Sequence, residues 1–295
     1  MLSAIPREQT RARRPDRTGH VERDGVRLFY EVYGSEGPAV FLLPTWSIIH
    51  SRHWKLQIPY LARHFRVLTF DGRGSGRSDR PASGYQEREF VADALAVLDA
   101  TSTQSAALVS LSLGSRWALM LAADHQERVD AAAFIAPSAP LGETLASQQP
   151  YLWDRELKID KGWTKYNRHY WLRDYRGFLE FFFAQMFPEP HSTKQIEDCV
   201  GWGLETTPEI LIATEVEKEF DEAATRELCS RVRWPVMVIQ GADDLVTGSS
   251  RGIALAEATG GELVLMEGSG HGPHARDPVK VNLLLREFMG RLGGK

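Results

Sequence analysis

The sequence has little of what marks several classes of protein. It holds two cysteines, Cys199 and Cys229, among 295 residues, too few for a disulfide framework and not spaced as zinc ligands are. No apolar run approaches the roughly 18 residues that span a bilayer, and the N-terminus lacks the apolar core of a secretory signal. We therefore expect a cytoplasmic protein with reduced thiols, no membrane span and no bound metal.

An excess of charge is also missing. The net charge of −4 at pH 7 gives no reason to expect nucleic acid as a partner. With 43% hydrophobic and 25% charged residues, the chain has the composition of a globular protein with ample core. The one basic stretch is an N-terminal arm, residues 1–18, which we expect to be disordered and solvated, with docking to an acidic partner as the alternative. Its arginines are Arg7, Arg11, Arg13, Arg14 and Arg17.

From His20 onward, apolar runs alternate with helical spacing. Asp24-Gly25, between two alternating segments, predicts a hairpin over 21–34. Runs typical of buried strands recur at 39–43, 66–71, 106–109, 131–136, 235–240 and 262–266. Helical spacing appears at 87–98, and a closing helix is expected over 278–292. The alternation predicts an α/β fold with a mostly parallel, doubly wound sheet built from residues 19–139 and 232–295.

Residues 140–231 interrupt this pattern. Buried strands disappear, helical segments take their place and aromatic side chains become frequent, which predicts a helical lid inserted into the sheet domain. Rings of this kind pack a core as often as they line a pocket. One stretch of this segment interleaves aromatic rings with polar donors, and its side chains are the candidates for substrate contact: Trp163, Tyr166, Arg168, Tyr170 and Trp171. For Arg168, a solvated position at the surface is the alternative.

The stretch around Ser112 carries the first chemical signal. A buried strand ends in Ser110-Leu111-Ser112-Leu113-Gly114, and a helix-forming run follows. A strand, a tight turn and a helix are what a nucleophile elbow requires, and Ser112 stands at the position of its nucleophile. Ser110 replaces the first glycine of that pattern and is less permissive of a strained backbone.

Two further motifs follow the last two strands. Gly241 to Asp244 ends one strand with a pair of acids, and Gly270-His271-Gly272 follows the other. The chain order is therefore serine, acid, histidine, each at the carboxyl edge of the sheet, where ligands bind in such folds. A serine hydroxyl needs a neutral imidazole to remove its proton, and a buried carboxylate to orient that imidazole.

Together these motifs resemble those of the α/β-hydrolase-fold serine hydrolases. The resemblance runs from about His20 to the C-terminus apart from the lid, and it includes the loop Asp71 to Ser78. It implies a catalytic triad of Ser112, Asp244 and His271 and no cofactor. Some relatives take the acid from the preceding strand, where this chain has Pro137-Ser138-Ala139 and offers none.

The oxyanion hole is where the sequence departs from this family. Relatives carry His-Gly after the third strand, whereas this chain has Pro44-Thr45. By position, the backbone amides of Trp46 and Leu113 would be the two donors. We expect the Thr45 hydroxyl either to act as a third donor or to fix the loop.

These features predict a hydrolase that cleaves an ester-type acyl bond of a small or medium, largely apolar or aromatic substrate. C–C bond hydrolases, thioesterases, lactonases and perhydrolases use the same triad, and fold alone does not choose among them. A weakly catalytic ligand-binding receptor is the alternative of another class, favoured by the Pro44-Thr45 departure. The partner expected is a small-molecule substrate, and a homo-oligomer stays open.

Overall fold

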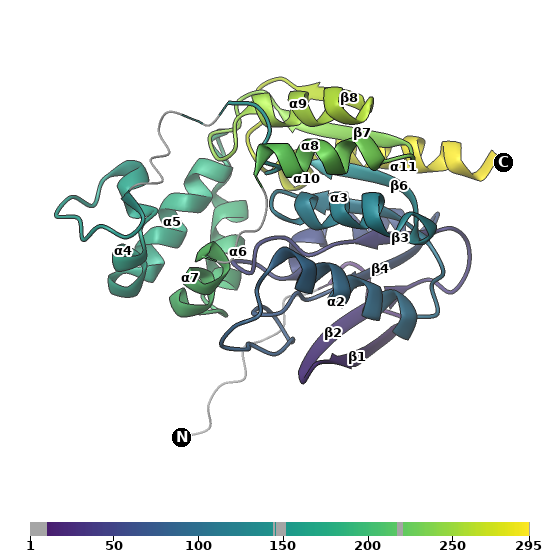
Figure 1. Cartoon of the computed structure of the whole chain (residues 1–295), viewed down its shortest axis with the longest axis horizontal. Helices are drawn as coiled ribbons and strands as arrows, with labels where there is room; N and C mark the ends of the chain where they lie inside the picture. Colours follow the sequence, from purple (N-terminus) through teal and green to yellow (C-terminus); the bar gives the residue numbers. More distant parts are fainter. Residues whose placement is uncertain (1–10, 144, 146–151, 217–220, 295) are drawn as a thin grey trace.

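The computed structural model describes residues 11–143, 145, 152–216 and 221–294. Its centre is an eight-stranded sheet with the strand order β1-β2-β4-β3-β5-β6-β7-β8 (Figure 1). β2 runs antiparallel to both β1 and β4, and all other neighbours are parallel. The expected mostly parallel α/β sheet is thereby confirmed. The strands are β1 (Arg17–Arg23), β2 (Val26–Tyr33), β3 (Ala39–Leu42), β4 (Arg66–Phe70), β5 (Ala106–Leu111), β6 (Val129–Ile135), β7 (Val236–Gly241) and β8 (Glu262–Met266).

The N-terminal hairpin turns at Asp24 and Gly25, as the sequence indicates. Both residues have positive φ angles, 50° and 77°, which a two-residue hairpin turn between twisted strands requires. The pairing extends back to Arg17, opposite Val32. Ordered structure therefore begins earlier than His20, because the ladder continues for three residues beyond it.

Part of the basic arm contacts the folded protein. Residues 1–10 lie outside the described residues, but Arg11 pairs with the buried carboxylate of Glu31 at 2.6 Å. Arg13 donates to the carbonyl of Ala62 at 2.7 Å. Residues 11–16 are thus held against the sheet domain by contacts that composition alone does not indicate.

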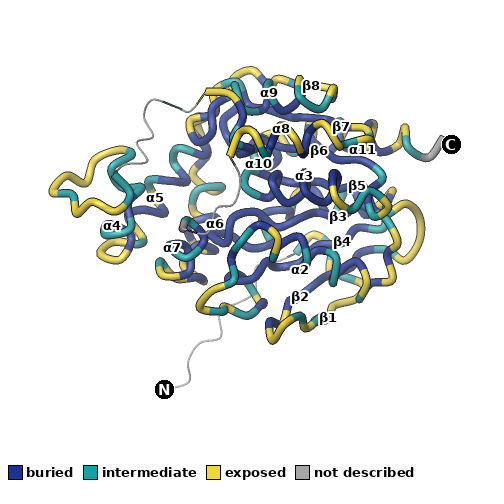
Figure 2. Tube along the Cα trace, viewed as in Figure 1, coloured by how far each residue is buried: buried dark blue, intermediate teal, exposed yellow. Residues whose placement is uncertain are grey.

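Helices cover both faces of the sheet, whose central strands are buried (Figure 2). The buried apolar side chains form two separate cores, one on each face. Along β3, Val40 and Leu42 join one core while Phe41 and Leu43 join the other, as the alternation of side chains along a strand dictates. One layer consists of α2 (Glu87–Ala100), α3 (Gly114–Asp124), α8 (Glu222–Arg231) and α9 (Ser249–Thr259). The other consists of α1 (Ile58–Leu61), α10 (Pro273–Arg276) and α11 (Pro278–Gly290).

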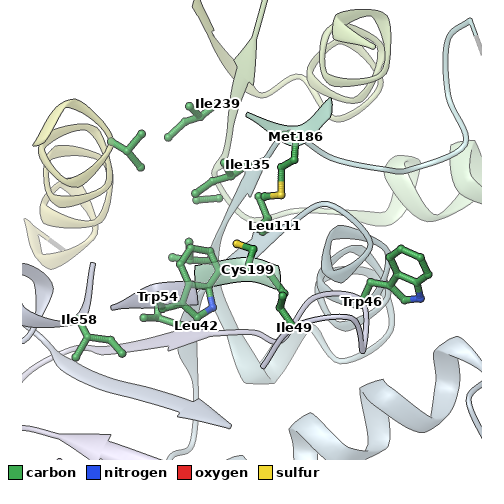
Figure 3. Packing of buried hydrophobic residues seen from close by; sticks show 14 of the residues in the cluster. Leu42, Trp46, Ile49, Trp54, Ile58, Leu111, Ile135, Met186, Cys199 and Ile239 are labelled. Atoms are coloured by element: carbon green, nitrogen blue, oxygen red, sulfur yellow. The ribbon is translucent and has the colours of Figure 1, made fainter. Parts of the chain in front are cut away.

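A helical insert between β6 and β7 lies at one end of the sheet (Figure 1). We use this name for α4 (Arg168–Arg173), α5 (Tyr175–Met186), α6 (Thr193–Gly203) and α7 (Pro208–Val216). Met186 and Cys199 of the insert pack into the same core as Leu111 of the sheet (Figure 3). α8 lies within residues 140–231, which the sequence predicts as the lid. It packs instead beside α3 and α9 of the sheet domain, because its Leu228 and Cys229 belong to the core under those helices.

Short 3-10 helices complete the described chain: η1 (Ser51–Trp54), η2 (Gln126–Arg128), η4 (Gly162–Lys165) and η5 (Arg291–Gly294). Among the described helices, none combines the length and the apolar character that crossing a bilayer demands.

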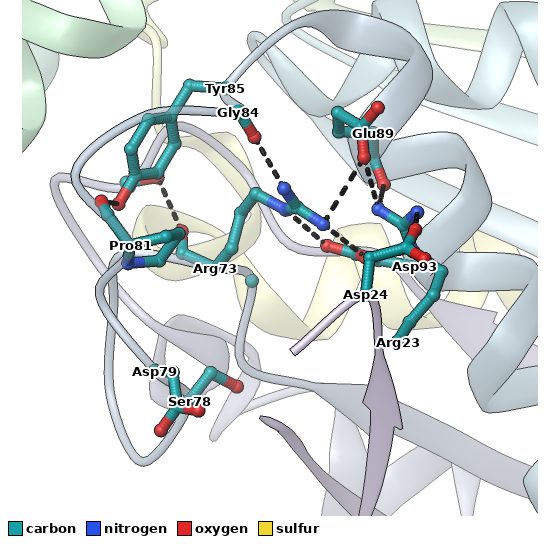
Figure 4. A network of polar contacts seen from close by, with 12 residues as sticks. Arg23, Asp24, Arg73, Ser78, Asp79, Pro81, Gly84, Tyr85, Glu89 and Asp93 are labelled. Atoms are coloured by element: carbon teal, nitrogen blue, oxygen red, sulfur yellow. Dashed lines mark hydrogen bonds and ion pairs between the residues drawn. The ribbon is translucent and has the colours of Figure 1, made fainter. Parts of the chain in front are cut away.

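The glycine-rich loop after β4 is tied down by buried charge (Figure 4). Arg73 forms two hydrogen bonds of 2.7 Å with Asp93, whose carboxylate also accepts from Arg23 at 2.8 Å. Asp71 accepts from the backbone amides of Ser51 and Arg77, at 3.0 and 2.9 Å. These polar residues therefore hold the glycine-rich loop in place.

Candidate active site

Ser112 sits on a strained turn between β5 and α3. Its φ of 51° is sparsely populated for a residue with a side chain, and such strain persists only where the surroundings impose it. The backbone supplies that constraint: Ser112 N–H donates to Ile135 at 3.0 Å, and Ser138 N–H donates to the carbonyl of Ser112 at 3.1 Å. The Ser112 side chain is left half-buried at the end of the strand.

The elbow also demands a glycine at residue 114. A Cβ placed on Gly114 would stand 2.3 Å from the carbonyl oxygen of Pro44, well inside contact distance. The turn and the loop after β3 therefore lie too close together for a side chain at residue 114. Ser110, in place of the first glycine of the pattern, is fully buried, with its hydroxyl 3.4 Å from that of Ser115.

Asp244 and His271 form a buried pair. His271 Nδ1 lies 2.8 Å from Asp244 Oδ2, with side-chain exposures of 2% and 0%. Burial alone would raise the pKa of Asp244, but the charge of His271 and its hydrogen bond, with donors from Thr247, hold that pKa well below its usual value. The carboxylate is therefore ionised at neutral pH and accepts a hydrogen bond from the Nδ1 side of the ring.

The carboxylate of Asp244 has more partners than the sequence suggests. Its Oδ1 accepts from the amides of Val246 and Thr247 at 2.8 and 2.9 Å. Its Oδ2 accepts from the Thr247 hydroxyl at 2.8 Å and from the Gln240 amide at 3.1 Å. Neither side chain is predictable from a motif, although Thr247 lies three residues after the acid, the spacing of a carboxylate that receives the amides of a following turn.

Ser112, Asp244 and His271 all follow the carboxyl ends of parallel strands, β5, β7 and β8. Within the described residues the Ser112 hydroxyl makes no hydrogen bond to His271. Catalytic hydrogen bonds are often long before substrate binds. The backbone of His271 is tied to the insert, since its N–H donates to Met186 at 3.1 Å.

The loop after β3 holds its side chains firmly and leaves backbone donors unused. The Thr45 hydroxyl donates to the carbonyl of Leu111 at 2.9 Å, so its single hydrogen is engaged. In the described part of the chain the N–H groups of Trp46 and Leu113 donate no hydrogen bond. The Trp46 indole instead donates to Thr214 of α7 at 2.7 Å and joins the loop to the insert.

The predicted substrate-binding side chains, which run from η4 into α4, lie in different surroundings. The Tyr166 and Trp171 rings lie 6.1 and 5.7 Å from that of Trp46. Trp163 packs on Tyr166 and Phe181. Tyr170 donates to Asp174 at 2.8 Å, and Arg168 pairs with Asp154 at 2.9 Å with its side chain 40% exposed. Of these five side chains, Tyr166 and Trp171 therefore reach the loop after β3.

Charged residues stand beside this apolar wall. Burial raises the pKa of Tyr166 well above its usual value, and Glu215, which accepts its hydroxyl hydrogen, raises it further. Arg116 of α3 pairs with Glu87 of α2 at 3.0 Å, and a small cavity against Leu113 is lined by Glu87 and Trp46. In the residues that the structure describes, no group of three His, Cys, Asp or Glu side chains could hold a metal ion.

Comparison with known proteins agrees with this architecture. Residues 38–278 match the family described as alpha/beta hydrolase fold. The AB hydrolase superfamily protein YisY of Bacillus subtilis (strain 168) is 28% identical over 89% of this chain and 95% of its own length. The chain belongs to the α/β-hydrolase fold family.

Solved structures with the same fold include hydrolases of several kinds. Est816, described as an N-acyl homoserine lactone degrading enzyme, is 27% identical with a TM-score of 0.76, covering 92% of this chain and 100% of its own. The esterase RhEst1 from Rhodococcus sp. ECU1013 is 25% identical with a TM-score of 0.77, covering 94% and 98%. Other relatives are named bromoperoxidase, enol-lactonase and meta-cleavage product hydrolase. Relatedness at this level defines a hydrolase fold and leaves the substrate open.

Proposed function

We propose that this protein is a serine hydrolase that cleaves an ester-type acyl bond through an acyl-enzyme on Ser112. The observation that carries the proposal is the buried pair of His271 and Asp244, 2.8 Å apart, on the same sheet edge as a serine held at a φ of 51°. A buried carboxylate and imidazole beside a strained serine elbow have one well-understood use, the activation of a hydroxyl nucleophile.

The steps follow from these groups. Ser112 Oγ attacks the substrate carbonyl and His271 Nε2 accepts its proton, while Asp244 stabilises the imidazolium at Nδ1. The oxyanion accepts hydrogen bonds from the N–H groups of Trp46 and Leu113. His271 then protonates the leaving oxygen, the C–O bond breaks, and water deprotonated by His271 releases the acid from Ser112.

The Pro44-Thr45 departure does not remove the oxyanion hole in this account. The Thr45 hydroxyl bonds to Leu111, so it fixes the loop, and the amides of Trp46 and Leu113 stay available in the described residues. This supports catalysis over the receptor function, which would follow from a distorted hole. The hydrophobic rings of Trp46, Tyr166 and Trp171 favour a small or medium apolar or aromatic acyl group.

A lactone is the second candidate substrate, because Est816, which degrades lactones by its description, covers nearly the whole chain at 27% identity. A lactone is an internal ester, so the same nucleophile and the same oxyanion donors would open it. The two candidates differ in the substrate and share the chemistry.

Pre-steady-state kinetics with 4-nitrophenyl acetate tests the proposal. We expect a burst of nitrophenolate stoichiometric with enzyme, followed by slower turnover, because acylation of Ser112 precedes deacylation. The Ser112→Ala variant should lose the burst and at least ~10⁴-fold in kcat. A burst that survives in this variant, or steady hydrolysis of equal rate, contradicts the assignment of Ser112.

A further inference from the structure

Among the residues that the structure describes, Arg251 has no carboxylate partner. It lies in the first turn of α9, is half-buried, and its Nε is shielded from solvent with no hydrogen-bond acceptor. Its one hydrogen bond in the described chain runs from Nη1 to the carbonyl of Ser138, at 3.4 Å. Guanidinium stays charged inside proteins, and a buried donor left unsatisfied is destabilising.

One residue, Ser138, connects Arg251 to the backbone of the candidate nucleophile. Ser138, whose carbonyl it contacts, donates its own N–H to the carbonyl of Ser112 at 3.1 Å. Arg116, one turn after Ser112 in α3, donates its Nε to the same carbonyl of Ser138 at 3.1 Å. Two guanidinium groups thus meet at the carbonyl of Ser138, the residue whose N–H contacts the serine backbone.

The two arginines differ in whether a carboxylate neutralises their charge. Arg116 is paired with Glu87, and both side chains are at most 10% exposed. Asp244 acts on Arg251 through space only, since its oxygens accept from Val246, Thr247, Gln240 and His271. Burial lowers the pKa of Arg251, Arg116 lowers it further, and Asp244 opposes both effects. Arg251 is therefore a cation with no direct counter-charge among the described residues.

We propose that Arg251 binds a carboxylate of the substrate, so that the preferred esters carry a second, acidic group at the far end of the acyl chain. The proposal rests on the proposed function. The terminal Nη1 and Nη2 groups can form two parallel hydrogen bonds with a carboxylate, and Nη2 makes no hydrogen bond within the described residues. Arg168, the arginine that the sequence offered as a candidate for substrate contact, is paired with Asp154.

Matched substrate pairs test this role. Ethyl half-esters of succinic, glutaric and adipic acid are compared with the same ethyl esters in which a carboxamide replaces the free carboxylate, with hydrolysis followed by pH-stat titration. At the chain length that fits, we expect kcat/KM of the wild type to be at least ~10-fold higher for the acid, the value of a charge-assisted hydrogen bond. Arg251→Gln should abolish the difference through KM and leave the amide within about 2-fold. Arg251→Lys, which keeps the charge without the fork, should fall between them.

Arg233→Gln is the matched control, because it removes the same charge at an exposed residue near the opposite end of β7 and should leave the preference intact. Adipate should also inhibit wild-type cleavage of 4-nitrophenyl acetate competitively, a readout that needs no variant. Equal losses in kcat for acid and amide in Arg251→Gln, or a shifted pH–rate profile, would overturn the proposal and make Arg251 a positioning residue for Asp244. If the wild type prefers the carboxamide esters at every chain length, the role of Arg251 is overturned too. If the wild type hydrolyses neither series of esters and shows no burst with 4-nitrophenyl acetate, the proposed function itself is refuted.

Discussion

At the scale of single residues, the site depends on two backbones in close approach. Gly114 has no room for a side chain, since a Cβ would stand 2.3 Å from the carbonyl oxygen of Pro44. Because residue 114 has no side chain, the loop after β3 and the elbow can lie in contact. The first bears the Trp46 amide and the second bears the Leu113 amide. The position of both proposed oxyanion donors follows from this close approach.

Gly114→Ala should accordingly push the loop after β3 away from the elbow. We expect kcat to fall by about 10²–10³-fold, the loss associated with one oxyanion donor, with a modest decrease in the melting temperature. Steady-state kinetics with 4-nitrophenyl acetate and a thermal melt measure both. Full activity in a folded Gly114→Ala protein would mean that the two backbones do not define the hole.

Thr45 provides a second test at this scale. Thr45→Val removes the hydrogen bond to Leu111 and leaves a buried carbonyl unsatisfied, which should cost about 1–3 kcal/mol of unfolding free energy. Thr45→Ser keeps the hydroxyl and should match the wild type in kcat. If Thr45→Ser folds normally but loses ~10²-fold in kcat, the methyl group rather than the hydrogen bond sets the loop.

At the scale of elements, the insert and the sheet domain are joined through the site. Trp46 of the loop after β3 donates to Thr214 of α7 at 2.7 Å. Thr206, which follows α6, donates to Gly74 of the glycine-rich loop at 2.7 Å. Both threonines are buried, but only the first bonds to a side chain of the candidate oxyanion loop.

This difference gives a matched pair of variants. Thr214→Val should lower kcat several-fold, because the Trp46 indole loses its acceptor and the loop its anchor, and should cost about 1 kcal/mol of stability. Thr206→Val should cost similar stability while kcat stays unchanged. Chemical denaturation and steady-state kinetics on both variants separate the effects, and equal kcat values in the two would count against a link between α7 and the hole.

The elements show where sequence patterns suffice. β8 lies at Glu262–Met266, the range that the apolar run predicts, and the Asp24-Gly25 turn is local chemistry. α9 was missed although Gly248 and Gly260 flank it, because its face toward the core is formed largely by small residues. The assignment of α8 to the sheet rather than the lid depends on contacts with α3, which no local pattern encodes.

The candidate site divides in the same way. Ser112, Asp244 and His271 are predictable because each lies within a short motif that follows a strand. Arg251 and Arg116 are not, since 135 residues separate them in the chain and only the packing of α3, α9 and the loop after β6 brings both to Ser138. Residues that surround a motif are determined by tertiary structure.

At the scale of the whole molecule, a buried histidine pair makes stability depend on pH. His53 Nδ1 of η1 lies 3.4 Å from His274 Nε2 of α10. Burial, with His271 nearby, lowers the pKa of His274 to about 3, and burial with His274 nearby lowers that of His53 well below its usual value. In the unfolded chain both titrate near pH 6.5, so the unfolded state binds more protons below that pH.

The folded state should therefore lose stability as the pH falls below about 6.5, by up to about 1.4 kcal/mol per pH unit for each histidine. Between about pH 6.5 and 5 few carboxylates titrate in either state, so the slope belongs to the histidines. Urea unfolding of the wild type and of His274→Gln at several pH values in this range measures it. The variant should show a shallower decline, and identical slopes would contradict the assignment.

The central claim is that His271 and Asp244 activate Ser112 as a nucleophile. Intact-mass spectrometry after treatment with a small fluorophosphonate tests it directly, on the wild type, Ser112→Ala and His271→Ala. We predict one adduct on the wild type, none on Ser112→Ala, and labelling slowed by several orders of magnitude on His271→Ala. No adduct on folded wild-type protein, or one that persists without the Ser112 hydroxyl, would contradict the claim.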